Sequence, residues 1–141
     1  MLKIRPGIIL TTIAAMMFVT AAHGNPKVVP VVPNFQPDPL ELTRGTSIGS
    51  SSNNCANLAS EPNIVVQLTQ DISSMRFILQ SAVGQPILKI DGPNSIPCLM
   101  ADGFSGGKIE VPGYWSQGTY SIYIGDRASG PQDYTLSISS Q

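Results

Sequence analysis

Short runs in which apolar and polar residues alternate fill the second half of the chain. At 64–69 and again at 75–80 every second residue is a large apolar one. This period of two is typical of a β-strand that buries one face and leaves the other in solvent. Two shorter strands are predicted at 86–91 and 108–111, and the Pro-Gly pair at 112–113 is expected to end the second of them.

The clearest alternation lies at 119–124 and 134–139, where Tyr, Ile and Leu take every second position. The residues between them, 125–131, are rich in Gly, Asp, Ser and Pro, which favour turns. These two segments are predicted to form an antiparallel hairpin. No segment after residue 24 shows the three- and four-residue apolar spacing of a helix. About six short strands separated by turn residues predict an antiparallel β-sandwich.

The first 24 residues have the organisation of a secretory signal peptide. Basic residues at positions 3 and 5 precede an apolar stretch at 7–19. Small residues suited to a cleavage site follow, namely Ala21, Ala22 and Gly24. Cleavage between Ala22 and Asn25 would deliver a secreted or periplasmic protein. The alternative is an uncleaved membrane anchor, but the apolar run is shorter than the ~20 residues that a spanning helix needs. After cleavage no membrane association is expected.

Proline is concentrated in residues 25–47, which hold five of the twelve prolines of the chain. Such spacing excludes helix and favours extended, polyproline-like chain. Residues 25–47 are therefore predicted to be a semi-rigid linker before a domain at 48–141. A recognition segment for a partner with a proline-binding groove is the alternative.

Charge argues against a nucleic-acid partner. From Asn25 onward six Lys and Arg face nine Asp and Glu, a formal charge of −3. The basic residues are scattered singly, whereas a phosphate-binding surface clusters them.

Two cysteines, Cys55 and Cys98, are the only ones in the chain. In an oxidising compartment they are expected to form an intramolecular disulfide. A metal or redox pair would need close spacing such as C-x-x-C, or further ligands, and the sequence has neither.

The mature chain offers little catalytic chemistry. Its one histidine, His23, is removed with the leader or left on the new terminus, so a histidine base or ligand is missing from the domain. No pair of carboxylates is placed as glycoside hydrolysis requires. The protein is therefore predicted not to be an enzyme. No cofactor is expected, although loop oxygens from Asp91, Asn94 and Asp102 are candidates for a calcium site.

An aromatic pair, Tyr114 and Trp115, is a candidate for stacking on a sugar ring. The alternative is that these rings cover the open end of the core. Neighbours on a strand point to opposite faces, so one exposed ring is compatible with either interpretation.

The order of these segments resembles the bacterial pre-peptidase C-terminal domain family, over about residues 48–139. The most specific pieces are Gly-Thr-Tyr-Ser-Ile-Tyr-Ile-Gly at 118–125 and Tyr-Thr-Leu-Ser-Ile at 134–138. Five other pieces match: the polar lead-in to the first cysteine at 52–55, the strand segments at 62–68, 75–81 and 86–93, and the second cysteine at 98. Relatives often place an acidic pair soon after that cysteine, whereas here Leu99, Met100 and Ala101 precede Asp102. This departure weakens the calcium hypothesis.

The resemblance implies a jelly-roll-like β-sandwich of about 6–8 short strands without catalytic residues of its own. Members usually accompany the catalytic domain of a secreted hydrolase, with suggested roles in secretion, folding or substrate binding. This domain is expected to stand alone, without a peptidase domain in the same chain. The leading hypothesis is an exported accessory or binding module for a secreted peptidase, a protein surface or an envelope polysaccharide. The alternatives are a structural envelope protein without a specific ligand, and a calcium- or carbohydrate-binding module.

Overall fold

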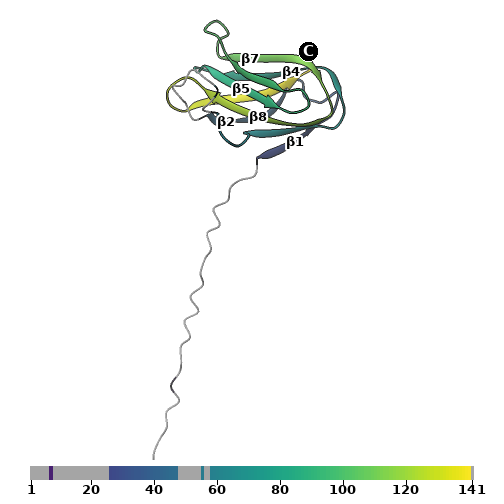
Figure 1. The fold of residues 1–141 in the computed structure, drawn as a ribbon, viewed down its shortest axis with the longest axis horizontal. Coiled ribbons are helices and arrows are strands. Elements are labelled where there is room, and N and C mark those ends of the chain that lie inside the picture. The colour runs from purple at the N-terminus through teal and green to yellow at the C-terminus, as the bar shows by residue number, and fades with distance from the viewer. Residues whose placement is uncertain (1–6, 8–25, 48–54, 56–57, 141) are drawn as a thin grey trace, which may run out of the picture.

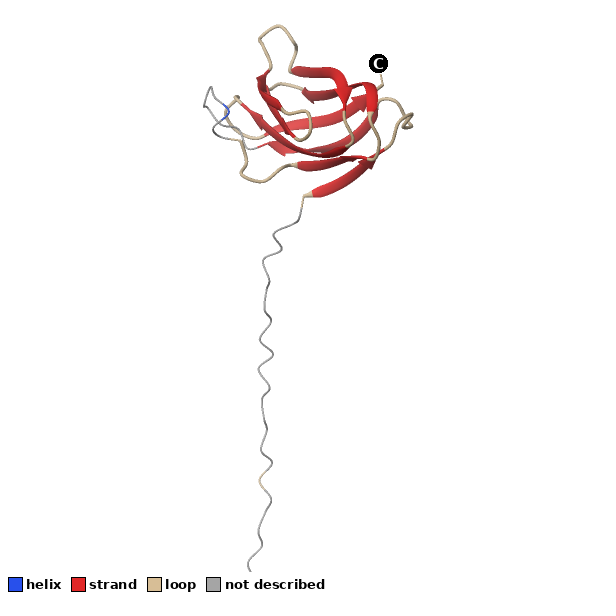
Figure 2. Cartoon of the chain, turned by 45° about the vertical axis from the view of Figure 1, so that its right-hand side comes forward, coloured by secondary structure: helices blue, strands red, loops and turns tan. Residues whose placement is uncertain are grey.

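The computed structural model describes residue 7 and residues 26–47, 55 and 58–140, so the predicted signal peptide lies almost wholly outside the described residues. The described part of the chain is built from nine β-strands. They lie in two layers (Figures 1 and 2). In chain order they are β1 (Lys27–Val31), β2 (Leu40–Ser47), β3 (Ile64–Leu68), β4 (Ile72–Ser81), β5 (Pro86–Asp91), β6 (Ile96–Met100), β7 (Lys108–Trp115), β8 (Gly118–Asp126) and β9 (Gln132–Ser139).

The strands form two sheets packed face to face, which confirms the predicted all-β sandwich. One sheet has five strands in the order β1-β3-β8-β5-β6, and the other has four in the order β2-β9-β4-β7. All neighbouring strands are antiparallel except β1 and β3, which are parallel. Among the described strands, β5 and β6 are the only consecutive ones paired in one sheet, and each other pair of consecutive strands is divided between the two layers.

The core lies between the sheets and follows the predicted alternation. On β3, β4, β8 and β9 the apolar residues of the period-two pattern are buried and their neighbours face outward. The fully buried side chains include three aromatic ones in contact, with Trp115 packed edge-on against Phe77 and Tyr120. Among the described residues, no helix is long and apolar enough to cross a membrane.

Residues 27–47 are part of the sandwich, which corrects the prediction of a linker over 25–47. They form β1 and β2, one edge strand of each sheet, and bury Val31, Phe35 and Leu42. The prolines fit because Pro30 lies on an edge strand and the others lie outside the strands, where a missing amide hydrogen breaks no inner ladder. The folded unit therefore includes residues 27–47 in addition to the domain predicted at 48–141.

Two further predictions about strands are wrong. β8 and β9 were expected to pair as a hairpin, but β8 pairs with β3 and β5 while β9 pairs with β2 and β4 in the other sheet. The strand predicted at 108–111 continues through Pro112 and Gly113 to residue 115. β7 is an edge strand, and an edge strand can accommodate Pro112, whose missing amide hydrogen would interrupt the hydrogen bonds of an inner strand.

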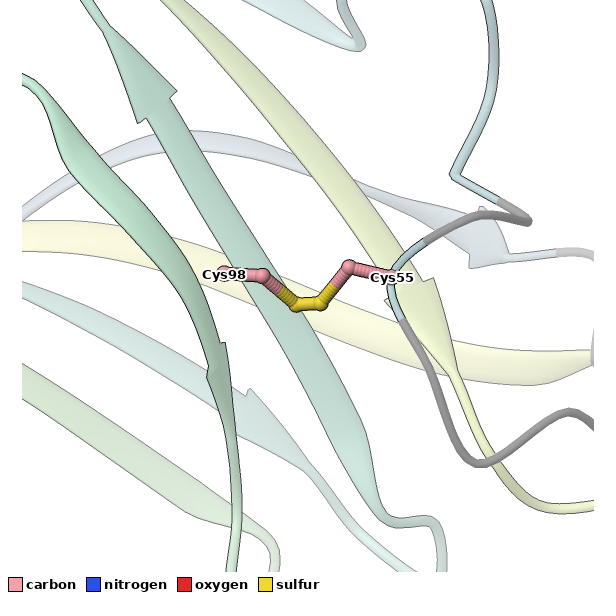
Figure 3. The surroundings of a disulfide bond; sticks show 2 residues. All are labelled: Cys55 and Cys98. Carbon is pink, nitrogen blue, oxygen red and sulfur yellow. A yellow bond between two sulfur atoms is a disulfide. The ribbon is translucent and has the colours of Figure 1, made fainter.

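The predicted disulfide between Cys55 and Cys98 is present, with Cα atoms 5.9 Å apart (Figure 3). Cys98 lies on β6, an edge strand that the sequence pattern did not predict, so the bridge joins the edge of the five-stranded sheet. Leu58 follows this bridge and packs so closely on Gly125 that a Cβ there would come within 2.9 Å of its Cδ2. Cys55 is thereby tied to β6, and Leu58 lies against β8.

Candidate functional site

One end of the sandwich gathers polar side chains around an exposed aromatic ring. The connections β3–β4, β5–β6 and β7–β8 all lie at this end. The pairing registers show that β3, β5 and β7 end here and that β4 and β8 begin here. Tyr114 is the last residue but one of β7 and is 52% exposed. Its neighbour Trp115 points the opposite way and is 1% exposed.

Trp115 is a core residue, so the packing interpretation of the aromatic pair is confirmed for this ring. Its Nε1 donates a hydrogen bond of 2.9 Å to the carbonyl oxygen of Met75. The β4–β7 pairing is irregular between Ile72 and Met75, and the indole provides a partner for this carbonyl. Ligand stacking on Trp115 would require opening the core, which leaves Tyr114 as the aromatic candidate.

Tyr114 is held by its hydroxyl and by its backbone. The hydroxyl donates to Asp71 Oδ2 at 2.7 Å, and the Tyr114 carbonyl oxygen accepts from Asn94 Nδ2 at 2.6 Å. The second carboxylate oxygen of Asp71 accepts from the backbone N–H of Gln117 at 2.7 Å. We call these four residues, Tyr114, Asp71, Asn94 and Gln117, the Tyr114 site.

Glycines let the loop that carries Asn94 approach β7. Gly118 has φ of 147°, and a Cβ there would lie 2.5 Å from Cγ of Pro93. A Cβ at Gly92 would lie 2.5 Å from the ring of Tyr120. Any larger residue at either position would push the β5–β6 loop away and separate Asn94 from Tyr114.

The protonation states of the site follow from these contacts. The hydrogen bond from the Gln117 amide, and then the one from the Tyr114 hydroxyl, lower the pKa of Asp71. The same hydrogen bond to Asp71, together with burial, raises the pKa of Tyr114. At neutral pH the site therefore presents an ionised carboxylate and a neutral phenol, which is the pair that the observed hydrogen bond requires.

Local sequence patterns predict one part of this site and not the other. Tyr114 was named for stacking and Asn94 for metal binding, and the structure brings these two together. Asp71 is 43 residues from Tyr114 and Gln117 contributes through its backbone, so no local spacing indicated either of them.

The three calcium candidates do not share one site. Asp91 and Asn94 lie before β6, and Asp102 follows it, so five residues of extended chain, about 17 Å, separate the two groups. Asp91 contacts Lys89 Nζ at 3.4 Å, and Asp102 accepts the backbone N–H of Phe104 at 2.9 Å. In the described ranges no three His, Cys, Asp or Glu residues gather in a way that would hold a metal ion. Binding of calcium at one of these positions stays a prediction.

Comparison with known proteins gives similarities at low identity. No family model matches the chain. An uncharacterized protein of Synechococcus elongatus is 28% identical over 133 residues, which cover 92% of this chain and 93% of that protein.

Solved structures similar to this one include a domain of the family that the sequence resembles. The pre-peptidase C-terminal domain of a collagenase from Bacillus anthracis is 13% identical with a TM-score of 0.49, over 80% of this chain and 95% of that one. A carbohydrate-binding module of Cellvibrio mixtus lichenase 5A is 13% identical with a TM-score of 0.35, over 74% and 92%. The C-terminal module of the laminarinase LamC of Zobellia galactanivorans is 12% identical with a TM-score of 0.32, over 69% and 99%. At these values the ligand of this chain has to be inferred from its own residues.

Proposed function

We propose that this protein is an exported, non-catalytic binding module that stacks a sugar ring of an envelope or extracellular polysaccharide on Tyr114. The observation that carries the proposal is the anchored ring: Tyr114 is half-exposed, yet its hydroxyl and its carbonyl oxygen are each fixed by a hydrogen bond. A fixed ring loses little conformational entropy when a ligand covers it.

The chemistry around the ring fits a saccharide. A pyranose has an apolar C–H face that packs on an aromatic ring and a rim of hydroxyl groups that needs donors and acceptors. Asp71 supplies carboxylate oxygens beside the ring, and the side chains of Asn94 and Gln117 belong to neighbouring loops at this end. No Lys or Arg belongs to the Tyr114 site, and Asp71 is negative, so the site favours neutral or amino sugars over acidic ones.

Export is the remaining part of the proposal. The leader at 1–24 has the organisation of a cleaved signal peptide. The disulfide between Cys55 and Cys98 is suited to an oxidising compartment, since such bonds persist in secreted and periplasmic proteins. A module of this kind would act outside the cytoplasm, on polymers of the cell surface or its surroundings.

The test is retention on insoluble cellulose, chitin and peptidoglycan, followed by calorimetric titration with soluble fragments of whichever polymer retains the protein. Tyr114→Ala should abolish retention, because the stacking surface is lost. Tyr114→Phe should bind more weakly than the wild type, since the ring remains but its anchor on Asp71 is gone.

The matched control is Tyr123→Ala, which removes a partly exposed tyrosine on β8 outside the site. It should leave binding unchanged. Wild-type protein that no polymer retains would overturn the saccharide proposal and favour the structural envelope role. Retention that survives Tyr114→Ala would place binding on another surface.

A further inference from the structure

A groove lies on the outer face of the four-stranded sheet, where β2, β9 and β4 run side by side. Its volume is about 420 Å³. The register places Arg44, Thr135 and Gln80 in one row across these strands, on the face opposite the buried Leu79 and Leu136. We call it the Gln80 groove, and its lining residues are Arg44, Gly45, Thr46, Gln80, Ala82, Asp133, Tyr134 and Thr135.

The ring of Tyr114 lies on this same outer face. Trp115 points into the core and neighbours on a strand point to opposite faces, so Tyr114 points outward from the four-stranded sheet. Six residues of β7, about 20 Å of strand, separate Tyr114 from Lys108, and Lys108 pairs with Gln80. The Tyr114 site and the Gln80 groove therefore mark two ends of one face.

The surface between these two ends combines paired charges with apolar area. Ile78 on β4 is half-buried and faces outward, since both of its neighbours on the strand are buried. Opposite it on β7, Glu110 contacts Arg76 Nη1 at 3.4 Å and Lys108 Nζ at 2.9 Å. The charged groups of this strip thus contact one another, and Ile78 offers apolar surface to the C–H face of a sugar.

The groove itself presents both hydrogen-bond donors and acceptors. Nε and Nη2 of Arg44 each donate to Glu41 at 2.7 Å, and Asp133 Oδ1 accepts from Thr46 Oγ1 at 2.8 Å. Among the described residues these contacts use two nitrogens of Arg44 and one oxygen of Asp133, so donors and acceptors remain for a ligand. Thr135 adds a hydroxyl group. A sugar hydroxyl both donates and accepts, so it suits such a mixed set of groups.

Both ends of the face disfavour an acidic ligand. In the groove, the carboxylates of Glu41 and Asp133 outnumber the guanidinium of Arg44. At the other end, Asp71 places a carboxylate beside the Tyr114 ring. A neutral polymer meets no charge repulsion at either end, whereas an acidic one meets it at both.

We propose that the outer face of the four-stranded sheet binds one linear, neutral polysaccharide along its length, with one sugar stacked on Tyr114 and a later sugar of the same chain in the Gln80 groove. The inference rests on the proposed saccharide function and adds the class of ligand to it, namely internal segments of a long chain. A disaccharide is too short to reach from one end to the other, whereas a hexasaccharide is long enough. Two contacts made by one chain bind more tightly than either alone, because the second forms at a high effective concentration.

The test is calorimetric titration of the intact mature protein with cello-oligosaccharides and chito-oligosaccharides of two to six sugars. In the series that binds, the affinity should rise at least about tenfold from the disaccharide to the hexasaccharide. Asp133→Ala combined with Thr135→Ala shortens two outward-facing polar side chains of the groove. This double variant should lose most of that rise and should bind the disaccharide like the wild type.

The matched control is Gln67→Ala combined with Thr119→Ala, which shortens two exposed polar side chains that pair on the five-stranded sheet. It should show the same dependence on chain length as the wild type. Urea denaturation of both double variants checks that each is folded.

NMR chemical shifts of the wild type give a measurement that needs no variant. The hexasaccharide should shift the amide of Gln117 at one end and those of Gln80 and Thr135 at the other, whereas the disaccharide should shift those of one end only. Retention on a polymer through Tyr114 without any gain in affinity along either series, or shifts confined to the Tyr114 site, would overturn the extended face and leave the proposed function standing. A protein that neither series binds and no polymer retains would overturn both.

Discussion

The hydroxyl of Tyr114 and the carboxylate of Asp71 form a hydrogen bond of 2.7 Å between residues 43 positions apart. Asp71 lies between β3 and β4, and Tyr114 lies on β7, so the bond joins a connection between the two sheets to an edge strand. The position of the exposed ring is thus set by the fold of the whole sandwich and not by its own strand alone.

The Asp71 contacts predict a pH dependence of the Tyr114 site. Because the Gln117 amide and the Tyr114 hydroxyl lower the pKa of Asp71 in the folded state, its contribution to stability is fully present above the ordinary value of 3.8. It is lost as the pH falls below that value and through the lowered pKa. NMR titration should show the Gln117 amide resonance shifting only below pH 3.8, together with the Asp71 carboxyl. Asp71→Asn should abolish this transition, and an amide that titrates near neutral pH would contradict the assignment.

Substitutions of the adjacent residues Trp115 and Tyr114 should differ in their effect on the stability of the protein. Trp115→Phe removes the donor to the Met75 carbonyl and leaves a small cavity beside Phe77, so we expect a loss of about 2–4 kcal/mol in the free energy of unfolding. Tyr114→Phe removes only a hydrogen bond on an exposed ring and should cost clearly less than Trp115→Phe. Urea denaturation of both variants measures the difference. Equal losses would contradict the opposite orientations of the two rings.

The part of this fold that the sequence predicts is the part that depends only on the alternation of apolar and polar residues. A period of two shows that a strand buries one face, and β3, β4, β8 and β9 were found in this way. Alternation does not show in which sheet a strand lies. The predicted hairpin of β8 and β9 failed for this reason, since either sheet of a sandwich accepts the same pattern.

Proline and short length concealed β1 and β6, two of the strands that the sequence pattern did not predict. β1 contains Pro30 and pairs on one side only, and β6 is five residues long with its apolar pattern interrupted by Pro97 and Cys98. At an edge, a strand tolerates residues that would break an inner one. The Tyr114 site was only half found because Asp71 reaches Tyr114 through tertiary packing, which no sequence spacing reports.

The disulfide should contribute strongly to stability while leaving ligand binding intact. Cys55 and Cys98 are 43 residues apart, and a closed loop of this length restricts the unfolded chain by about 4 kcal/mol in the chain-entropy model. Cys55→Ser with Cys98→Ser should lower the free energy of unfolding by up to that amount. Reduction of the wild type should produce the same loss. A double variant as stable as the oxidised protein would show that the bridge constrains little.

Two glycines of the β6–β7 loop provide a final contrast. Gly107 has φ of 76°, and a Cβ there would lie 2.1 Å from the backbone carbonyl oxygen of Ser81. Gly107→Ala must therefore strain the backbone and displace the loop from β4, and we expect it to lower the free energy of unfolding by at least about 1–2 kcal/mol. Gly103→Ala, where a Cβ would meet nothing within 4 Å, should be close to neutral. Thermal or urea unfolding measures both, and faster hydrogen exchange of the Ser81 amide, which donates to Gly107 at 2.8 Å, should accompany the first substitution alone. If both variants unfolded alike and the Ser81 amide stayed protected in each, the loop would not be held on β4 through Gly107.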